Sequence, residues 1–104
     1  MNKQSIIKIA ETYGFDAQSR QCIEEMAELT VALNKYHRIT NDMHYAYEHR
    51  KCIEYIKEEI ADVYIMLEQM KYLLNIYEDD IETIINRKIL RQLERIEQKK
   101  LETR

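Results

Sequence analysis

The chain has 104 residues, of which 45% are hydrophobic and 34% are charged, with a formal net charge of −3. This length allows one domain, which we place at residues 1–104, and the balanced charge lacks the basic excess typical of nucleic-acid-binding proteins. One glycine and no proline leave few helix breakers, so we expect an all-α protein.

A short first helix is expected from about residue 4 to residue 13. Gly14 predicts its end, because glycine adopts the left-handed conformation of a helix cap at little cost. Phe15, the next residue, is then expected to enter the core. The N-terminus leads into no long apolar run, so we expect neither a secretion signal nor a membrane partner.

The two cysteines, Cys22 and Cys52, are too few for a disulfide framework and are not spaced as a metal-binding pair. They are typical of buried, reduced thiols in an intracellular protein. A cytoplasmic location is therefore expected.

The second helix, about residues 17–38, carries the acidic motif Glu24-Glu25-Met26-Ala27-Glu28-Leu29. At 100° per residue, one apolar stripe of this helix predicts its packing seam, meaning the line of residues that contacts a neighbouring helix. Glu25 lies beside this seam and Glu28 follows one step farther around the helix. The seam consists of Cys22, Met26, Leu29, Leu33 and Tyr36.

Residues 39–44 contain a turn-like cluster of polar residues and predict the loop between the two long helices. His44, Tyr45 and Tyr47 close to this loop are consistent with a rim that contacts a base or sugar. Ordinary packing at the start of a long helix explains them equally well.

The third helix, about residues 45–74, repeats the acidic motif 34 positions after its first copy, as Glu58-Glu59-Ile60-Ala61-Asp62-Val63. Glu59 lies to one side of the expected seam, and Asp62 lies one step beyond it. Because residues 60–67 are apolar nearly all round, we expect a second subunit to cover the remaining face, in a homodimer or a dimer of dimers. The seam consists of Ile53, Ile56, Ile60, Val63, Leu67, Met70 and Leu74.

Asn75, followed three residues later by Glu78, predicts the start of the last helix. Acids crowd the first turns of this helix and bases its later part, as the helix dipole favours. Residues 98–104 lack apolar spacing and are expected to fray.

Four carboxylates, from Glu25, Glu28, Glu59 and Asp62, therefore occupy equivalent positions on two neighbouring helices. Carboxylates gathered in a partly dry place repel one another and lose hydration unless a cation binds them, and hard oxygen ligands favour Mg²⁺ or Mn²⁺. Each acid taken alone is also typical of the solvated flank of a bundle helix. None of the three histidines follows a glutamate by three residues, so the Glu-x-x-His pattern of di-iron bundles is absent.

The order Glu25-x-x-Glu28 and then Glu59-x-x-Asp62, on two long helices, resembles the MazG-like all-α nucleoside triphosphate pyrophosphohydrolases. The doubled acids that include Glu24 and Glu58 fit the fuller pattern of that family, and the resemblance covers about residues 15–95. The helices expected from the residues predict a four-helix-type bundle, with a short first helix, two long motif helices and a C-terminal helix, completed by homo-oligomerisation.

The same resemblance implies Mg²⁺-dependent hydrolysis of a nucleoside triphosphate between its α and β phosphates, giving pyrophosphate and the ribo- or deoxyribonucleoside monophosphate. Glu25, Glu28, Glu59 and Asp62 would be the metal-binding and catalytic residues, and Glu24 and Glu58 possible accessory acids.

Three basic residues are candidates for contacts to the substrate phosphates. Lys35 lies two turns beyond Glu28, close to the same line on the helix surface. Lys88 and Arg91 best match the basic cluster that the resembling family carries in the helix after its second acidic motif. The alternative is an ordinary charged helix surface, which is the simpler explanation for Lys35.

Two other classes of function stay open. One is a nucleotide- or metal-binding relative without catalytic activity, and the other is a helical protein-interaction module. An interaction module would keep its function after Glu59→Gln or Asp62→Asn, whereas an enzyme would not.

Overall fold

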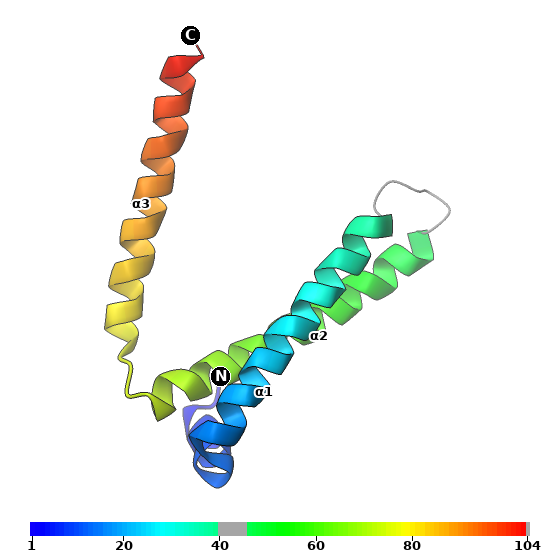
Figure 1. Ribbon diagram of the computed structural model, residues 1–104, viewed down its shortest axis with the longest axis vertical. Coiled ribbons are helices and arrows are strands. Elements are labelled where there is room, and N and C mark those ends of the chain that lie inside the picture. Colours follow the sequence, from blue (N-terminus) through cyan, green and yellow to red (C-terminus); the bar gives the residue numbers. More distant parts are fainter. Residues whose placement is uncertain (40–45, 104) are drawn as a thin grey trace. The chain divides into compact units, whose positions relative to one another are not determined.

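Three α-helices form this protein in a computed structural model that describes residues 1–39 and 46–103 (Figure 1). They are α1 (Lys3–Ile39), α2 (Ala46–Leu73) and α3 (Glu78–Glu102), and the described ranges contain no strand. The prediction of an all-α protein is therefore confirmed. The loop and the rim predicted around His44 and Tyr45 fall mostly outside the described residues. The chain divides into two compact units, residues 1–74 and residues 75–104.

Helix α1 begins with a side-chain cap and bends at its one glycine. The Asn2 Oδ1 atom accepts a hydrogen bond of 3.1 Å from the backbone N–H of Ser5, which satisfies one of the free amides at a helix start. Gly14 has φ 81° and ψ 169°, a conformation open essentially to glycine alone. A Cβ at this position would meet no atom within 4 Å, so the requirement is one of conformation and not of space. The predicted break at Gly14 thus appears as a kink within one helix.

Helices α1 and α2 form an antiparallel hairpin that contains the core of the first unit (Figure 1). At one end of the hairpin, Gln18 Nε2 donates a hydrogen bond to Gln69 Oε1. At the other end, the ring centroids of Tyr36 and His49 lie 4.5 Å apart. The buried apolar residues of this hairpin are Ile6, Ala10, Cys22, Ala32, Cys52, Ile56, Val63 and Met66.

The expected seams are only half right. On α2, Ile56 and Val63 are buried as predicted, but the buried line runs through Glu59 itself, which was placed to one side. The reason is that the apolar sector of each helix is wider than the strip that one neighbouring helix covers. Phe15, expected in the core, is also exposed. The predicted seam residues that remain exposed are Met26, Leu33, Ile53, Ile60, Leu67 and Leu74.

Helix α2 ends where Asn75 takes a left-handed conformation with φ 58°, which asparagine tolerates better than most residues. Asn75 therefore closes α2 and does not cap the next helix as expected; the N-cap of α3 is Tyr77, which makes no side-chain capping bond. Helix α3 continues through the predicted frayed segment to Glu102 and buries none of its side chains. None of the described helices is both long and apolar enough to cross a membrane.

Candidate metal centre

The antiparallel hairpin brings the two acidic motifs together. Glu25, Glu59 and Asp62 each offer one carboxylate oxygen, and these three oxygens lie within 4.8 Å of one another. Glu28 completes the group, because its carboxyl lies within hydrogen-bonding reach of Glu59. The four acids singled out in the sequence thus face one another in two pairs, Glu25 with Asp62 and Glu28 with Glu59.

The cluster extends into the dry interior of the hairpin. Glu59 is only 5% exposed, and its Oε2 atom is buried without a hydrogen-bond partner. The Oε2 atom of Glu25 is buried and unpartnered as well, whereas its Oε1 accepts a hydrogen bond of 2.8 Å from Gln21 Nε2. A buried carboxylate oxygen without a hydrogen-bond partner is unfavourable, so these two oxygens call for a cation or a proton.

Burial and repulsion by neighbouring carboxylates disfavour the charged forms of Glu59 and Asp62. Loss of hydration is the main cause that raises the pKa of Glu59, followed by the negative charges of Glu28, Glu25 and Asp62. The pKa of Asp62 is also raised, first by burial, then by the charge of Glu25 and by a hydrogen bond that only the protonated form can donate. The folded chain therefore holds carboxyls that are easier to protonate than free ones.

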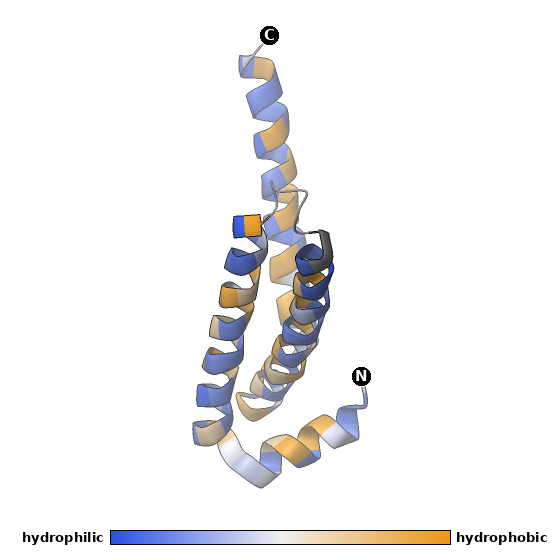
Figure 2. Ribbon diagram, turned by 90° about the vertical axis from the view of Figure 1, so that its right-hand side faces the viewer, coloured by the Kyte–Doolittle hydropathy of each residue, from blue (hydrophilic) through white to orange (hydrophobic). Residues whose placement is uncertain are grey.

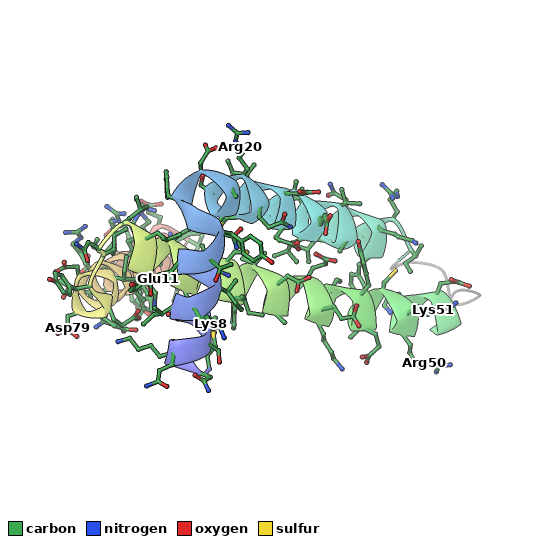
Figure 3. The ribbon with its side chains drawn as sticks, turned by 90° about the horizontal axis from the view of Figure 1, so that it is seen from below. Lys8, Glu11, Arg20, Arg50, Lys51 and Asp79 are labelled. Atoms are coloured by element: carbon green, nitrogen blue, oxygen red, sulfur yellow. The ribbon has the colours of Figure 1, made fainter. Side chains whose placement is uncertain are left out.

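No basic residue offsets this repulsion within the described part of the chain. The charged groups that raise the pKa of Glu59 are all carboxyls, and the ion pairs of Asp16, Glu54 and Glu68 involve acids outside the cluster. Arg20, for example, pairs with Asp16 at 3.3 Å and points away from α2 (Figure 3). The charge of the cluster is left for a ligand to balance.

Tyr55, one helical turn before Glu59 on α2, is a further member of the site. Its hydroxyl hydrogen-bonds to Glu59, and its pKa is raised chiefly by the charge of Glu59, then by burial and by the charges of Glu28 and Glu25. Tyr55 could have been predicted from the sequence as a neighbour of Glu59, because residues four apart on a helix share a face.

The remaining predicted site residues are not part of the cluster. Glu24 and Glu58 are exposed, each one residue before a cluster acid. Lys35 is exposed on α1, about 10 Å along the helix axis from Glu28. Lys88 and Arg91 lie on α3 in the second compact unit, so their contact with phosphate stays a prediction.

The geometry is that of a small, oxygen-only, strongly anionic site at the centre of a helical hairpin. Such donors suit a hard divalent cation, Mg²⁺ above all, more than a softer metal that prefers nitrogen or sulfur. Comparisons with protein-family models, with curated proteins and with solved structures find no match to this chain. The chemistry of the residues therefore carries the functional argument.

Proposed function

We propose that the protein is a Mg²⁺-dependent nucleoside triphosphate pyrophosphohydrolase, of the MazG-like type that the sequence resembles. The observation that carries the proposal is the convergence of three carboxylate oxygens within 4.8 Å around the buried Glu59. The buried oxygens of Glu25 and Glu59 that lack a hydrogen-bond partner support the proposal, because a bound cation would satisfy them.

In this proposal Glu25, Glu28, Glu59 and Asp62 hold Mg²⁺, with Mn²⁺ as an alternative ion. A bound ion would supply neutralisation of phosphate charge and activation of water as the nucleophile. Gln21 and Tyr55 orient Glu25 and Glu59 through their hydrogen bonds. Glu24 and Glu58 are the candidates for an accessory acid, and Lys35, Lys88 and Arg91 for contacts to phosphate.

The proposed enzyme is a homo-oligomer, a dimer or a dimer of dimers. In both helices the second acid of the motif, Glu28 or Asp62, is displaced in the same direction around the helix axis from the first, so in an antiparallel hairpin both lie toward one side. Residues displaced in the other direction therefore share the opposite side. They form what we call the second apolar face, and all are exposed: Phe15, Met26, Leu33, Ile53, Ile60 and Leu67.

A contiguous apolar face on a small protein marks an interaction site. A second copy on this face completes a bundle of four long helices, two from each chain. We also retain the cytoplasmic location, which is supported by the two buried, free cysteines.

The function is tested by incubating the purified chain with each ribo- and deoxyribonucleoside triphosphate and Mg²⁺ and by measuring pyrophosphate and orthophosphate separately. We expect pyrophosphate from at least one nucleotide, and none after chelation of the metal. Glu59→Gln should lower kcat by orders of magnitude, because it removes charge and keeps shape. The matched control is Glu54→Gln on the exposed side of α2.

Release of orthophosphate alone would refute the proposed reaction. Nucleotide binding without product would indicate the catalytically silent relative. Retention of full activity in Glu59→Gln would show that another cluster performs the chemistry.

A further inference from the structure

Helix α3 is a long amphipathic helix with a stripe of apolar residues. Its 25 residues bury no side chain, and it forms a compact unit of its own. Apolar side chains recur along it every three or four residues, so that apolar and polar segments alternate along the ribbon (Figure 2). They are Ile81, Ile85, Ile89, Leu93 and Ile96, and all of those after Ile81 are exposed.

A single helix of this composition is marginal in water, because most helical stability in proteins comes from packing an amphipathic face. Ile89, at the middle of the apolar stripe, is 54% exposed. We therefore expect the apolar stripe of α3 to pack against another protein surface.

The distribution of charges along α3 indicates which surface packs against this stripe. Residues 78–82 hold four acids and no base, whereas residues 87–100 hold six bases against two acids. A second α3 in antiparallel orientation places each acidic end beside a basic end. A parallel arrangement would place like charges together and would be repulsive at both ends.

We propose that α3 pairs with α3 of a second copy of this chain, in antiparallel orientation and with Ile89 at the centre. This register places Ile85 opposite Leu93 of the other copy and Ile81 one residue from the position opposite Ile96, so that apolar side chains meet along the stripe. It also places Glu78 beside Lys99 and Lys100. The inference concerns assembly alone and does not depend on the proposed reaction.

The second apolar face of the hairpin is the rival occupant. On α2 that face is bordered by Lys57 and Lys71, each four residues after one of its members. These bases match the acidic end of α3 but not its basic part. A second α3 matches both ends.

Disulfide cross-linking of the full-length chain tests both the partner and the orientation. Cys22 and Cys52 are buried and stay in place, and peptide mass spectrometry identifies which cysteines are joined. Ile89→Cys should cross-link to itself. Ile81→Cys and Ile96→Cys should each fail alone but should cross-link when the two variants are mixed. Thr83→Cys, on the other side of α3, is the matched control and should stay unlinked.

Charge reversal provides a second test that leaves the apolar stripe intact. In the Ile89→Cys chain, Glu78→Lys with Asp79→Lys should slow cross-linking several-fold, and adding Lys99→Glu with Lys100→Glu to the same chain should restore it. Self-linking of Ile81→Cys at the rate of the mixture would establish parallel pairing and overturn the proposal. Failure of Ile89→Cys to self-link, or its linkage to a cysteine placed at Leu67, would overturn it in favour of another occupant.

Discussion

Gln18 donates a hydrogen bond of 2.8 Å from its Nε2 to Oε1 of Gln69, inside the hairpin and 51 positions away along the chain. The two amides fix the register between α1 and α2. Seven residues inward from this pair stand Glu25 and Asp62, and ten residues inward stand Glu28 and Glu59. The register that satisfies two buried amides is therefore also the register that assembles the acidic cluster.

Gln69→Leu should destabilise the hairpin by about 1–3 kcal/mol, because it leaves the buried Gln18 amide without its partner. The double variant Gln18→Leu with Gln69→Leu should recover much of this loss, since no polar group then remains unpaired. Urea denaturation measures the free energy of unfolding of the wild-type chain, both single variants and the double variant. Together these four values form a double-mutant cycle. If the losses simply add, the two amides are not coupled.

Binding of a divalent cation should stabilise the chain without any nucleotide. At about 100 times its dissociation constant, Mg²⁺ adds roughly 2.7 kcal/mol per site, a shift in melting temperature on the order of 10 °C for a domain of this size. Asp62→Asn should abolish most of this shift and leave the metal-free protein equally or more stable, because one of the repelling charges is gone.

The controls for this experiment are NaCl at equal ionic strength, which should shift the melting temperature much less, and Glu54→Gln, which should keep the full response to Mg²⁺. Equal effects of Mg²⁺ and NaCl on the wild-type chain would remove the support for a metal centre.

The stability of the metal-free protein should depend on pH through the cluster. The pKa values of Glu59 and Asp62 are raised in the folded chain, so the folded state binds more protons than the unfolded state at pH values above the ordinary carboxyl range near 4. The contribution of these groups to the free energy of unfolding is therefore greatest at low pH and is lost as pH rises through the raised pKa values.

Glu59→Gln removes the most deeply buried of these acids, so this variant should gain stability relative to the wild-type chain as pH rises. Chemical denaturation in a chelating buffer from pH 4 to pH 8 follows the difference. Glu54→Gln should run parallel to the wild-type chain, and parallel behaviour of Glu59→Gln would contradict the prediction.

Two substitutions on α2 distinguish the core of the hairpin from the second apolar face. Val63 is 8% exposed, so Val63→Asp buries a charge at a cost of several kcal/mol, comparable to the whole stability of a small domain. Leu67 is 44% exposed, so Leu67→Asp should leave the hairpin helical but should block association through the second apolar face.

Circular dichroism and sedimentation measure the two effects separately. Ala61→Asp, an exposed position on the other side of α2, is the control and should change neither helicity nor association. A wild-type chain that sediments as a monomer would refute the proposed oligomer.

The repeated acidic motif made the cluster predictable. The spacing between the acids of each motif can be read from a few neighbouring residues. It places them on one side of a helix even when the predicted ends of that helix are wrong by several residues. The break at Gly14 was predictable for a similar reason, because the backbone requirement lies in one residue.

The packing of α2 was less predictable because it depends on a partner helix. Ile60 and Val63 are equally apolar, and only the position of α1 makes the second buried and the first exposed. Gln69, at 1% exposure, was missed since an amide enters a core only when a partner is present, and Gln18 is distant in sequence. The division between the hairpin and α3 could not be predicted, because the sequence of α3 has the same helical pattern as a helix that packs in the bundle.

The division of the chain at Asn75 gives each molecule two valences, one on the hairpin and one on α3, if both proposed surfaces are used. A molecule with a single self-complementary surface stops growing at the dimer, whereas a divalent molecule grows until its geometry closes. Closure at a tetramer requires the two symmetry axes to meet at right angles, and any other angle yields larger rings or filaments. If both surfaces are used, inserting one residue between α2 and α3 should change the size of the particle without altering either surface.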